Sequence, residues 1–336
     1  MKRRDFLKFL AGVLGGSSLA GLGCGRRVGK QTAVSPPRPP LSPTSPSPSS
    51  NAKVGRNRHD PHPVDGVDVA VSVGEDPSGM LKACLAAFGG IEAFVQRGDT
   101  VVIKPNLAWA RSPEQAANVQ PAVLAAVIKA AQAAGAGEVL VVEHSIDSAV
   151  AAFDLNGAAE VCKALRVPLI ALDHEQMYDR VAVSGVNIHE EQIARDILDC
   201  DCYINLACCK VHSASVVTLG LKNQMGAIWR PQNYHEAKSE LAQSNNLHQN
   251  IADLATALRP TLTIVDCTRA LLTNGPKGPG KTGKPKALVV SPDTVAADAV
   301  ACEFLGVKPN AVAHITLAAK AGVGRWQNLA IKRSHA

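Results

Sequence analysis

Short runs of valine, isoleucine and leucine alternate with longer amphipathic segments from residue 67 to residue 321. Near-continuous apolar runs are typical of strands covered on both faces, and the intervening segments are typical of the helices that cover them. The predicted strands are 67–73, 100–104, 138–143, 167–172, 180–186, 202–206, 262–266 and 287–290. The predicted helices are 79–88, 121–134, 150–165, 190–198, 247–258, 293–304 and 311–321. The alternation predicts an α/β fold, with a mostly parallel β-sheet flanked by helices.

The chain divides by composition into a leader, a linker and one globular domain. We assign 1–24 to a signal peptide, 25–66 to a Pro/Ser-rich linker, 67–325 to a single α/β domain and 326–336 to a tail. No internal repeat or second linker interrupts the domain. A small lobe inserted between residues 207 and 246 remains compatible with the pattern.

The N-terminus resembles a twin-arginine (Tat) export signal. It begins Met1-Lys2-Arg3-Arg4-Asp5-Phe6-Leu7-Lys8 and continues into a weakly apolar stretch over 9–23 that is rich in glycine. Glycine pairs make that stretch a poor buried helix, which favours a targeting segment. The sequence therefore predicts export by the Tat machinery to the periplasm or cell envelope.

Two processing sites fit the end of this signal. Cys24 resembles a lipoprotein acylation site, although Gly21 stands where that pattern usually has leucine, and Ser18-Leu19-Ala20 fits an ordinary cleavage site. Between residues 35 and 50, seven of sixteen residues are proline and six are serine, a composition that stays extended. A stiff tether after Cys24 favours a lipid anchor, which would be the chain's contact with the membrane.

The positive charge of the chain lies in the leader and not in the globular part. Of 35 Lys/Arg and 29 Asp/Glu, residues 1–65 hold 11 and 3, which leaves a net charge of −2 for the remainder. Aromatic residues make up only 4% of the chain, too few for a base-stacking surface. Nucleic acid is therefore not an expected partner.

The cysteine spacing does not match a common metal centre. The nine cysteines are Cys24, Cys84, Cys162, Cys200, Cys202, Cys208, Cys209, Cys267 and Cys302. They show neither the ferredoxin C-x2-C-x2-C-x3-C-P spacing nor the C-x2–4-C pairs of zinc sites. Eight cysteines after the leader could pair as disulfides, but a protein folded before export first meets a reducing cytoplasm. We expect them to fill the core.

Polar residues follow several predicted strands, at the edge where ligands bind in parallel sheets. The segments are Lys104-Pro105-Asn106, Glu143-His144-Ser145, Lys210-Val211-His212 and Asp266. Lys104 and Lys210 fit an anion or a general base, and His212 fits acid/base chemistry near neutral pH. The sequence predicts that these three residues are catalytic.

The stretch 210–226 is the richest in hydrogen-bonding groups. It includes Lys222 and Asn223, which we expect to bind a ligand together with Asn106 and with His235 further along the chain. The stretch lacks the G-x-x-x-x-G-K-[ST] and G-x-G-x-x-G orders, so neither ATP nor NAD is supported. A small anionic molecule is the expected ligand.

Three aspartates lie beside apolar strand or helix residues. Asp293 follows Ser291-Pro292 and fits a helix N-cap. Asp266 and Asp298 have no such explanation and, as buried carboxylates, need partners. We predict that Asp266 and Asp298 hold a divalent metal. The Gly- and Lys-rich segment 275–286 fits either a lid or a solvated loop.

Several of these motifs resemble the family called domain of unknown function 362. They are Ile103-Lys104-Pro105-Asn106-Leu107, Ile204-Asn205-Leu206, Lys210-x-His212, Thr218-Leu219-Gly220-Leu221-Lys222-Asn223-Gln224-Met225-Gly226, Ile264-Val265-Asp266, Gly275-Pro276 and Asp293-Thr294-Val295-Ala296-Ala297-Asp298. The resemblance covers roughly 67–325. The chain departs from it at Val119-Gln120-Pro121, where relatives tend to have Thr-His-Pro, and at Ala207-Cys208-Cys209, where they often have Pro-Lys-Leu. It also lacks the two cysteine quartets that many relatives carry.

The family name assigns no reaction, so function has to follow from the residues. The first hypothesis is an enzyme that acts on a small anionic substrate with a Lys/His site and a divalent metal. The second is an envelope-tethered binding protein that uses the same pocket without turnover. An iron–sulfur electron carrier is the third and has the least support.

Overall fold

The computed structural model describes residues 66–235 and 247–336. The signal peptide, most of the linker and Cys24 lie outside the described residues, as does part of the segment that we considered as a lobe. In the described part, no helix is both long and apolar enough to cross a membrane.

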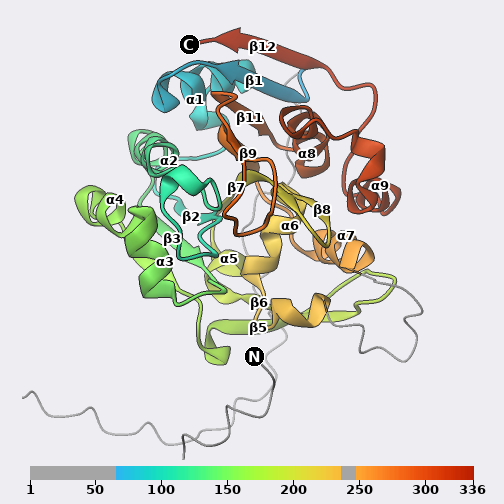
Figure 1. Ribbon diagram of the computed structural model, residues 1–336. Helices are drawn as coiled ribbons and strands as arrows, with labels where there is room; N and C mark the ends of the chain where they lie inside the picture. The colour runs from blue at the N-terminus through green and yellow to red at the C-terminus, as the bar shows by residue number, and fades with distance from the viewer. Residues whose placement is uncertain (1–65, 236–246) are drawn as a thin grey trace, which may run out of the picture. The chain divides into compact units, whose positions relative to one another are not determined.

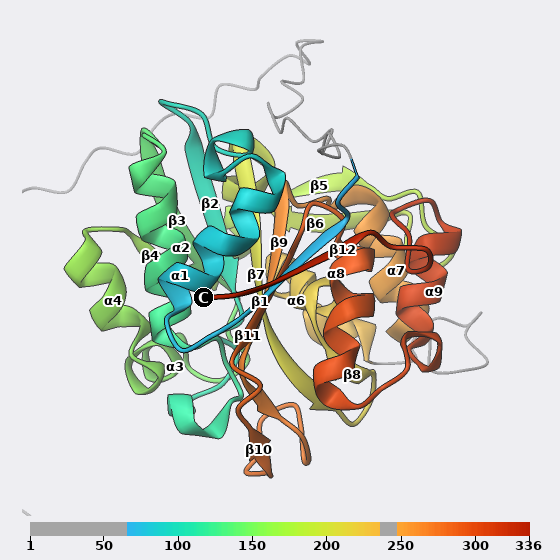
Figure 2. The same cartoon turned by 90° about the horizontal axis from the view of Figure 1, so that it is seen from above.

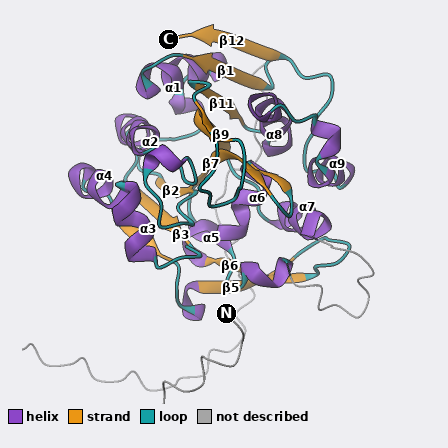
Figure 3. Ribbon diagram, viewed as in Figure 1, coloured by secondary structure: helices purple, strands orange, loops and turns teal. Residues whose placement is uncertain are grey.

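The described residues form three layers, with a mostly parallel sheet between two groups of helices (Figures 1 and 3). In spatial order the main strands are β12 (Ile331–His335), β1 (Val69–Val73), β11 (Ala287–Ser291), β9 (Leu262–Leu271), β7 (Cys202–His212), β2 (Thr100–Pro105), β3 (Glu138–Glu143) and β4 (Leu169–Ala171). Only β11 runs antiparallel to its two neighbours along this path. The predicted α/β fold class is confirmed.

Helices cover both faces of the sheet (Figure 2). One face packs against α1 (Pro77–Leu85), α2 (Pro121–Ala133), α3 (Ala149–Asn156) and α4 (Ala158–Leu165). The other packs against α5 (Arg195–Asp199), α6 (Gly220–Asn223), α7 (Leu247–Ala257), α8 (Thr294–Ala301) and α9 (Ala313–Lys320). Strand residues alternate between the two cores, as the twofold period of a strand requires: Ile264 faces the first core and Val265 the second.

Two short strands extend the central ones. β8 (Val216–Thr218) folds back on the end of β7 and places Thr218 opposite Lys210, and β10 (Thr282–Gly283) pairs with the end of β9. Since β7 continues six residues beyond the predicted strand end at 206, the segment from Lys210 to His212 belongs to the sheet.

The C-terminal segment is not a tail. Residues Ile331–His335 form β12, which pairs in parallel with β1 at one edge of the sheet. This edge strand is mostly exposed and carries Lys332 and Arg333, so it lacks the apolar run on which the strand prediction relied. The domain therefore continues to the end of the chain.

The expected helix over 190–198 is also wrong in part. Its first half is β6 (Glu190–Ala194), which pairs with β5 (Tyr178–Ala182) in a separate two-stranded sheet, and only α5 is helical. The four-residue spacing of Ile193 and Ile197 is compatible with a helix, yet the two lie in different elements. This β5–β6 sheet is the small addition to the domain. The described residues from 207 to 235 include the end of β7, β8 and α6, and Ile228 forms a bridge with Ile193 of β6.

A glycine divides the helix predicted over 150–165. Gly157 has a φ of 87°, which a continuous helix of L-residues cannot include, and the segment forms α3 and α4. The eight cysteines of the described residues are buried and unpaired, as expected of core residues.

Candidate functional site

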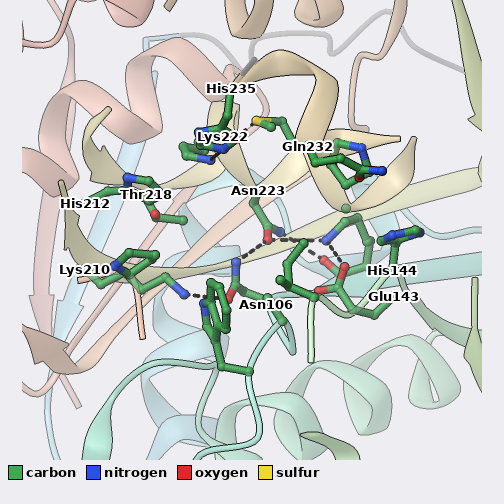
Figure 4. Close-up of a pocket in the computed structure, with 18 residues that line it drawn as sticks. Asn106, Glu143, His144, Lys210, His212, Thr218, Lys222, Asn223, Gln232 and His235 are labelled. Carbon is green, nitrogen blue, oxygen red and sulfur yellow. Dashed lines mark hydrogen bonds and ion pairs between the residues drawn. The ribbon is translucent and has the colours of Figure 1, made fainter. Parts of the chain in front are cut away.

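A pocket of about 370 Å³ lies at the carboxyl ends of β2, β3 and β7 (Figure 4). All seven residues predicted to bind a ligand or act in catalysis line it: Lys104, Asn106, Lys210, His212, Lys222, Asn223 and His235. Predicted residues from four separate segments of the sequence thus meet in one place. Five further polar or aromatic lining residues were not predicted as site residues, namely Trp109, Glu143, His144, Thr218 and Gln232.

Lys104 and Glu143 form a buried ion pair on the floor of the pocket. They extend from the neighbouring parallel strands β2 and β3, with Lys104 Nζ 2.9 Å from Glu143 Oε1. Lys104 Nζ also donates to the carbonyl of Pro105 at 2.8 Å, and Glu143 Oε2 accepts from the backbone N–H of Leu107 at 2.8 Å. Burial lowers the pKa of Lys104 and raises that of Glu143, while their attraction opposes both shifts.

Lys210 is equally buried and is held by oxygen atoms without a carboxylate. Its Nζ donates to Asn106 Oδ1 at 2.8 Å and to the carbonyl of Ala117. Asn106 donates in turn to Asn223 Oδ1 at 2.9 Å, and Lys104 Nζ lies 3.3 Å from the same oxygen. The asparagines therefore connect the two lysines. Burial lowers the pKa of Lys210 to about 8.

Lys222 has a different environment from the other two lysines. It lies on α6, the short helix after β8. Among the described residues, the hydrogen-bond partners of its Nζ are Met225 Sδ at 3.4 Å and His235 Nε2 at 3.5 Å. No carboxylate of the described residues forms an ion pair with it. Burial, with Lys210 nearby, lowers the pKa of Lys222 to about 7.

His212 and His235 stack beside Lys222, with ring centroids 5.8 Å apart. The backbone N–H of Ala214 donates to His212 Nδ1 at 3.0 Å. A neutral His212 therefore carries its proton on Nε2. Burial and the nearby cations lower its pKa to about 2, and burial lowers that of His235 to about 4. His212 is therefore placed to donate a hydrogen bond from Nε2–H. The sequence had predicted a role in acid/base catalysis, which is broader than donation of one hydrogen bond.

The metal prediction for Asp266 and Asp298 is wrong. Asp298 lies on α8 and accepts from the backbone N–H groups of Gly220 and Leu221 at 2.6 and 2.9 Å. Asp266 lies on β9 and accepts from Gln120 N at 2.7 Å and from Thr268 N and Oγ1. Burial raises the pKa of Asp298 to about 7 and that of Asp266 to about 6.

The sheet itself separates the two carboxylates. Asp266 faces the N-terminus of α2, on the side of the first core, whereas α8 belongs to the second core. Among residues 66–235 and 247–336, no group of three or more His, Cys, Asp or Glu side chains is arranged to hold a metal ion. Asp293 caps α8 through Val295 N and Ala296 N, as predicted.

Three of the missed residues had a signal in the sequence. Glu143 is the last residue of β3 and His144 follows it directly, at the same sheet edge as Lys104. His144 Nδ1 lies 3.0 Å from the Tyr178 hydroxyl, which itself donates to the carbonyl of Leu172. Thr218 lies in the stretch 210–226, which the sequence marks by its hydrogen-bonding groups, whereas Trp109 and Gln232 had no comparable signal.

The fold and the pocket define an α/β protein with a lysine- and histidine-lined site at the carboxyl edge of its sheet. Residues 101–303 match the model of the family described as Domain of unknown function (DUF362), and this chain belongs to that family. The resemblance expected from the motifs is confirmed, and every residue of the pocket lies within the matched range.

This chain is similar over part of its length to one curated relative and to two solved structures. The chain is 28% identical over 244 residues to the thylakoid-associated protein sll1697 of Synechocystis sp., with 73% of this chain and 74% of that protein aligned. A protein from Thermotoga maritima is similar at 11% identity and a TM-score of 0.42, over 69% of this chain and 60% of that one. The lactate racemase apoprotein from Thermoanaerobacterium thermosaccharolyticum is similar at 12% identity and a TM-score of 0.43, over 71% and 57%. This chain therefore spans less than two thirds of either solved structure.

Proposed function

We propose that this protein is an enzyme that binds a small anionic substrate in the pocket and moves a proton with Lys222. The observation that carries the proposal is the charge of the site. Lys104, Lys210 and Lys222 all line it, whereas Glu143 is the single carboxylate among the described lining residues. Buried charges need partners, so an anion would complete the site.

Three hydrogen-bond donors of the described pocket lining are available to such an anion. Lys222 Nζ lacks an oxygen partner among the described residues, His212 offers Nε2–H, and the buried Thr218 Oγ1 has no hydrogen-bond partner there. Thr218 and Lys210 are opposite each other in the β7–β8 pair, so their side chains leave the same face. The volume of the pocket is in the range of small-molecule sites.

Lys222 also supports proton transfer. A group whose pKa lies near the operating pH is populated in both states and can take up or release a proton during a reaction. With a pKa of about 7, Lys222 meets this condition, and His235 Nε2 is its nearest basic nitrogen. His235 is itself exposed and reaches solvent.

Calorimetric titration with oxalate and with inorganic phosphate tests the binding. We expect the wild-type protein and Lys129→Met, an exposed change on α2 remote from the pocket lining, to bind equally. Lys222→Met should weaken binding at least about tenfold, the loss expected of a charged hydrogen bond. Equal affinity of Lys222→Met and wild type would contradict the proposal.

Turnover is tested separately, with those hydroxy and oxo acids that bind. In D2O, NMR should detect exchange of a carbon-bound hydrogen or conversion with the wild-type protein, and neither with Lys222→Met. Binding of these acids without exchange or conversion would instead identify an anion-binding protein.

We also propose that the chain is exported by the Tat machinery and held at the cell envelope through Cys24. Support for this comes from the twin arginine, the weakly apolar stretch and the Pro/Ser-rich segment alone.

A further inference from the structure

The three buried lysines of the pocket differ in what surrounds their Nζ atoms. Lys104 is bonded to a carboxylate and a carbonyl, and Lys210 to an amide oxygen and a carbonyl. Oxygen acceptors of this kind stabilise an ammonium group. Lys222 has a thioether and an imidazole nitrogen in their place.

This environment favours the neutral amine at Lys222. Methionine sulfur is a weak acceptor, and the 3.5 Å contact with His235 is at the limit of a hydrogen bond. The side chain is 8% exposed, and the positive charge of Lys210 disfavours a second cation. Desolvation beside another cationic group is how a lysine becomes a nucleophile towards carbonyl carbon.

We infer that the substrate is a small acid that also carries an aldehyde or ketone, and that Lys222 forms an imine with its carbonyl carbon. This inference rests on the proposed anionic substrate and adds the reacting group. In this arrangement Lys210 and Thr218 face the anionic group, while Lys222 faces the carbonyl.

The chemistry balances without an added reagent. The lone pair of Nζ forms a bond to the carbonyl carbon, and the π electrons of the C=O bond move to oxygen. Both hydrogens of the neutral amine then pass to that oxygen, with His235 Nε2 as the carrier, and the C–O bond breaks. The products are the imine and one water molecule, and no atom is oxidised or reduced.

Lys104 and Lys210 are the internal controls for this assignment. All three lysines line the same pocket, so an oxo acid that enters it meets three amines. Only Lys222, whose Nζ has no oxygen acceptor within 66–235 and 247–336, should react. At pH 7 about half of the Lys222 side chains would be neutral, against fewer than about one in a thousand for an exposed lysine of ordinary pKa.

The test treats the wild-type protein at pH 7 with glyoxylate or pyruvate and reduces the mixture with cyanoborohydride. Peptide mass spectrometry then locates the adducts. We expect one adduct per chain at Lys222, formed more than about tenfold faster than at the exposed Lys129, and we expect oxalate to suppress it. Because the site is read from the wild-type protein, the result does not depend on a variant that folds.

Oxalate binding and labelling are both measured on the wild-type protein, which separates this inference from the proposed function. Lys222→Arg removes the reacting amine, since a guanidinium forms no imine under these conditions, and the variant should lose the adduct. Labelling of Lys222 no faster than Lys129, in a protein that binds oxalate, overturns the inference and leaves the anion site standing. If oxalate does not bind and Lys222 is not labelled, both the proposed function and this inference are contradicted.

Discussion

Gly226 lies directly against the buried Glu143 carboxylate and leaves no room for a side chain. A Cβ atom at this position would overlap Glu143 Oε1 and would lie 2.7 Å from Lys104 Nζ. The carbonyl of Gly226 accepts from the backbone N–H of His144 at 3.2 Å. This hydrogen bond also holds the Gly226 backbone against the end of β3. The ion pair on the pocket floor therefore depends on a glycine in the short 3-10 helix Gln224–Ala227, which packs against it.

Gly226→Ala should consequently disturb the Lys104–Glu143 pair. We expect a loss of about 1–3 kcal/mol in the free energy of unfolding, the usual cost of overpacking, measured by urea denaturation. In a Glu143→Ala background the same change should cost less, since the nearest atom that the methyl group would meet is gone and only Lys104 Cε and Nζ, each at 2.7 Å, remain close to it. Equal costs in the two backgrounds would show that the two residues do not interact.

Asp298 controls the position of Lys222 through α6. Its carboxylate accepts the N–H groups of Gly220 and Leu221, the first two residues of that helix. Asp298→Ala leaves two buried donors without partners and should cost about 2–5 kcal/mol of stability and weaken oxalate binding.

Asp293→Ala is the matched control for this change. Asp293 also accepts two helix N–H groups, but those of α8, and it does not line the pocket. We expect a loss of about 0.5–2 kcal/mol with unchanged oxalate affinity. An Asp298→Ala protein that folds and binds oxalate like wild type would show that the carboxylate does not position α6 for binding.

The sequence was sufficient to predict the layered fold and several of the residues that line the pocket. Apolar runs indicated the central strands. Because ligands bind at the carboxyl ends of parallel strands, Lys104, Lys210 and His212 were expected at one site, and all three line the pocket. The edge strand β12 escaped prediction because an edge needs no apolar run: Ile331 is 40% exposed, and the strand is held by backbone pairing.

The roles of the site residues required three-dimensional contacts. Asp266 and Asp298 both look like unexplained carboxylates in the sequence. In the structure, Asp266 accepts the distant backbone N–H of Gln120, and Asp298 accepts those of Gly220 and Leu221. Likewise, three lysines of identical chemistry differ only in the atoms around Nζ. The spacing of residues along the sequence does not show which atoms will surround each of these side chains.

Export is predicted to depend on the arginine pair. Changing both Arg3 and Arg4 to lysine should retain the full-length chain in the cytoplasm, because Tat recognition depends on both arginines. Cell fractionation and immunoblotting measure this, and Cys24→Ala serves as the comparison. That variant should still be exported but should move from the membrane fraction to the soluble fraction. An unchanged distribution of the double variant at the arginine pair would contradict the Tat assignment.

Anion binding and imine formation should depend on pH in opposite directions. An anion prefers the charged lysines, so oxalate affinity should fall as pH rises through about 7, where Lys222 loses its proton, and again near 8, where Lys210 does. Imine formation needs the neutral amine, so its rate at Lys222 should rise between pH 5 and pH 7. His212 and His235, with pKa values of about 2 and 4, stay neutral throughout this range and add no step of their own. Asp298, with a pKa of about 7, loses its proton in the same interval, and its charged form is the better acceptor for the α6 N–H groups, so its contribution to affinity rises with pH. Lys222→Arg should remove the step near pH 7 and keep the one near 8, since the guanidinium stays charged. Calorimetry from pH 6 to pH 9 measures the two steps, and an affinity independent of pH over this interval would show that neither lysine changes charge in the pocket.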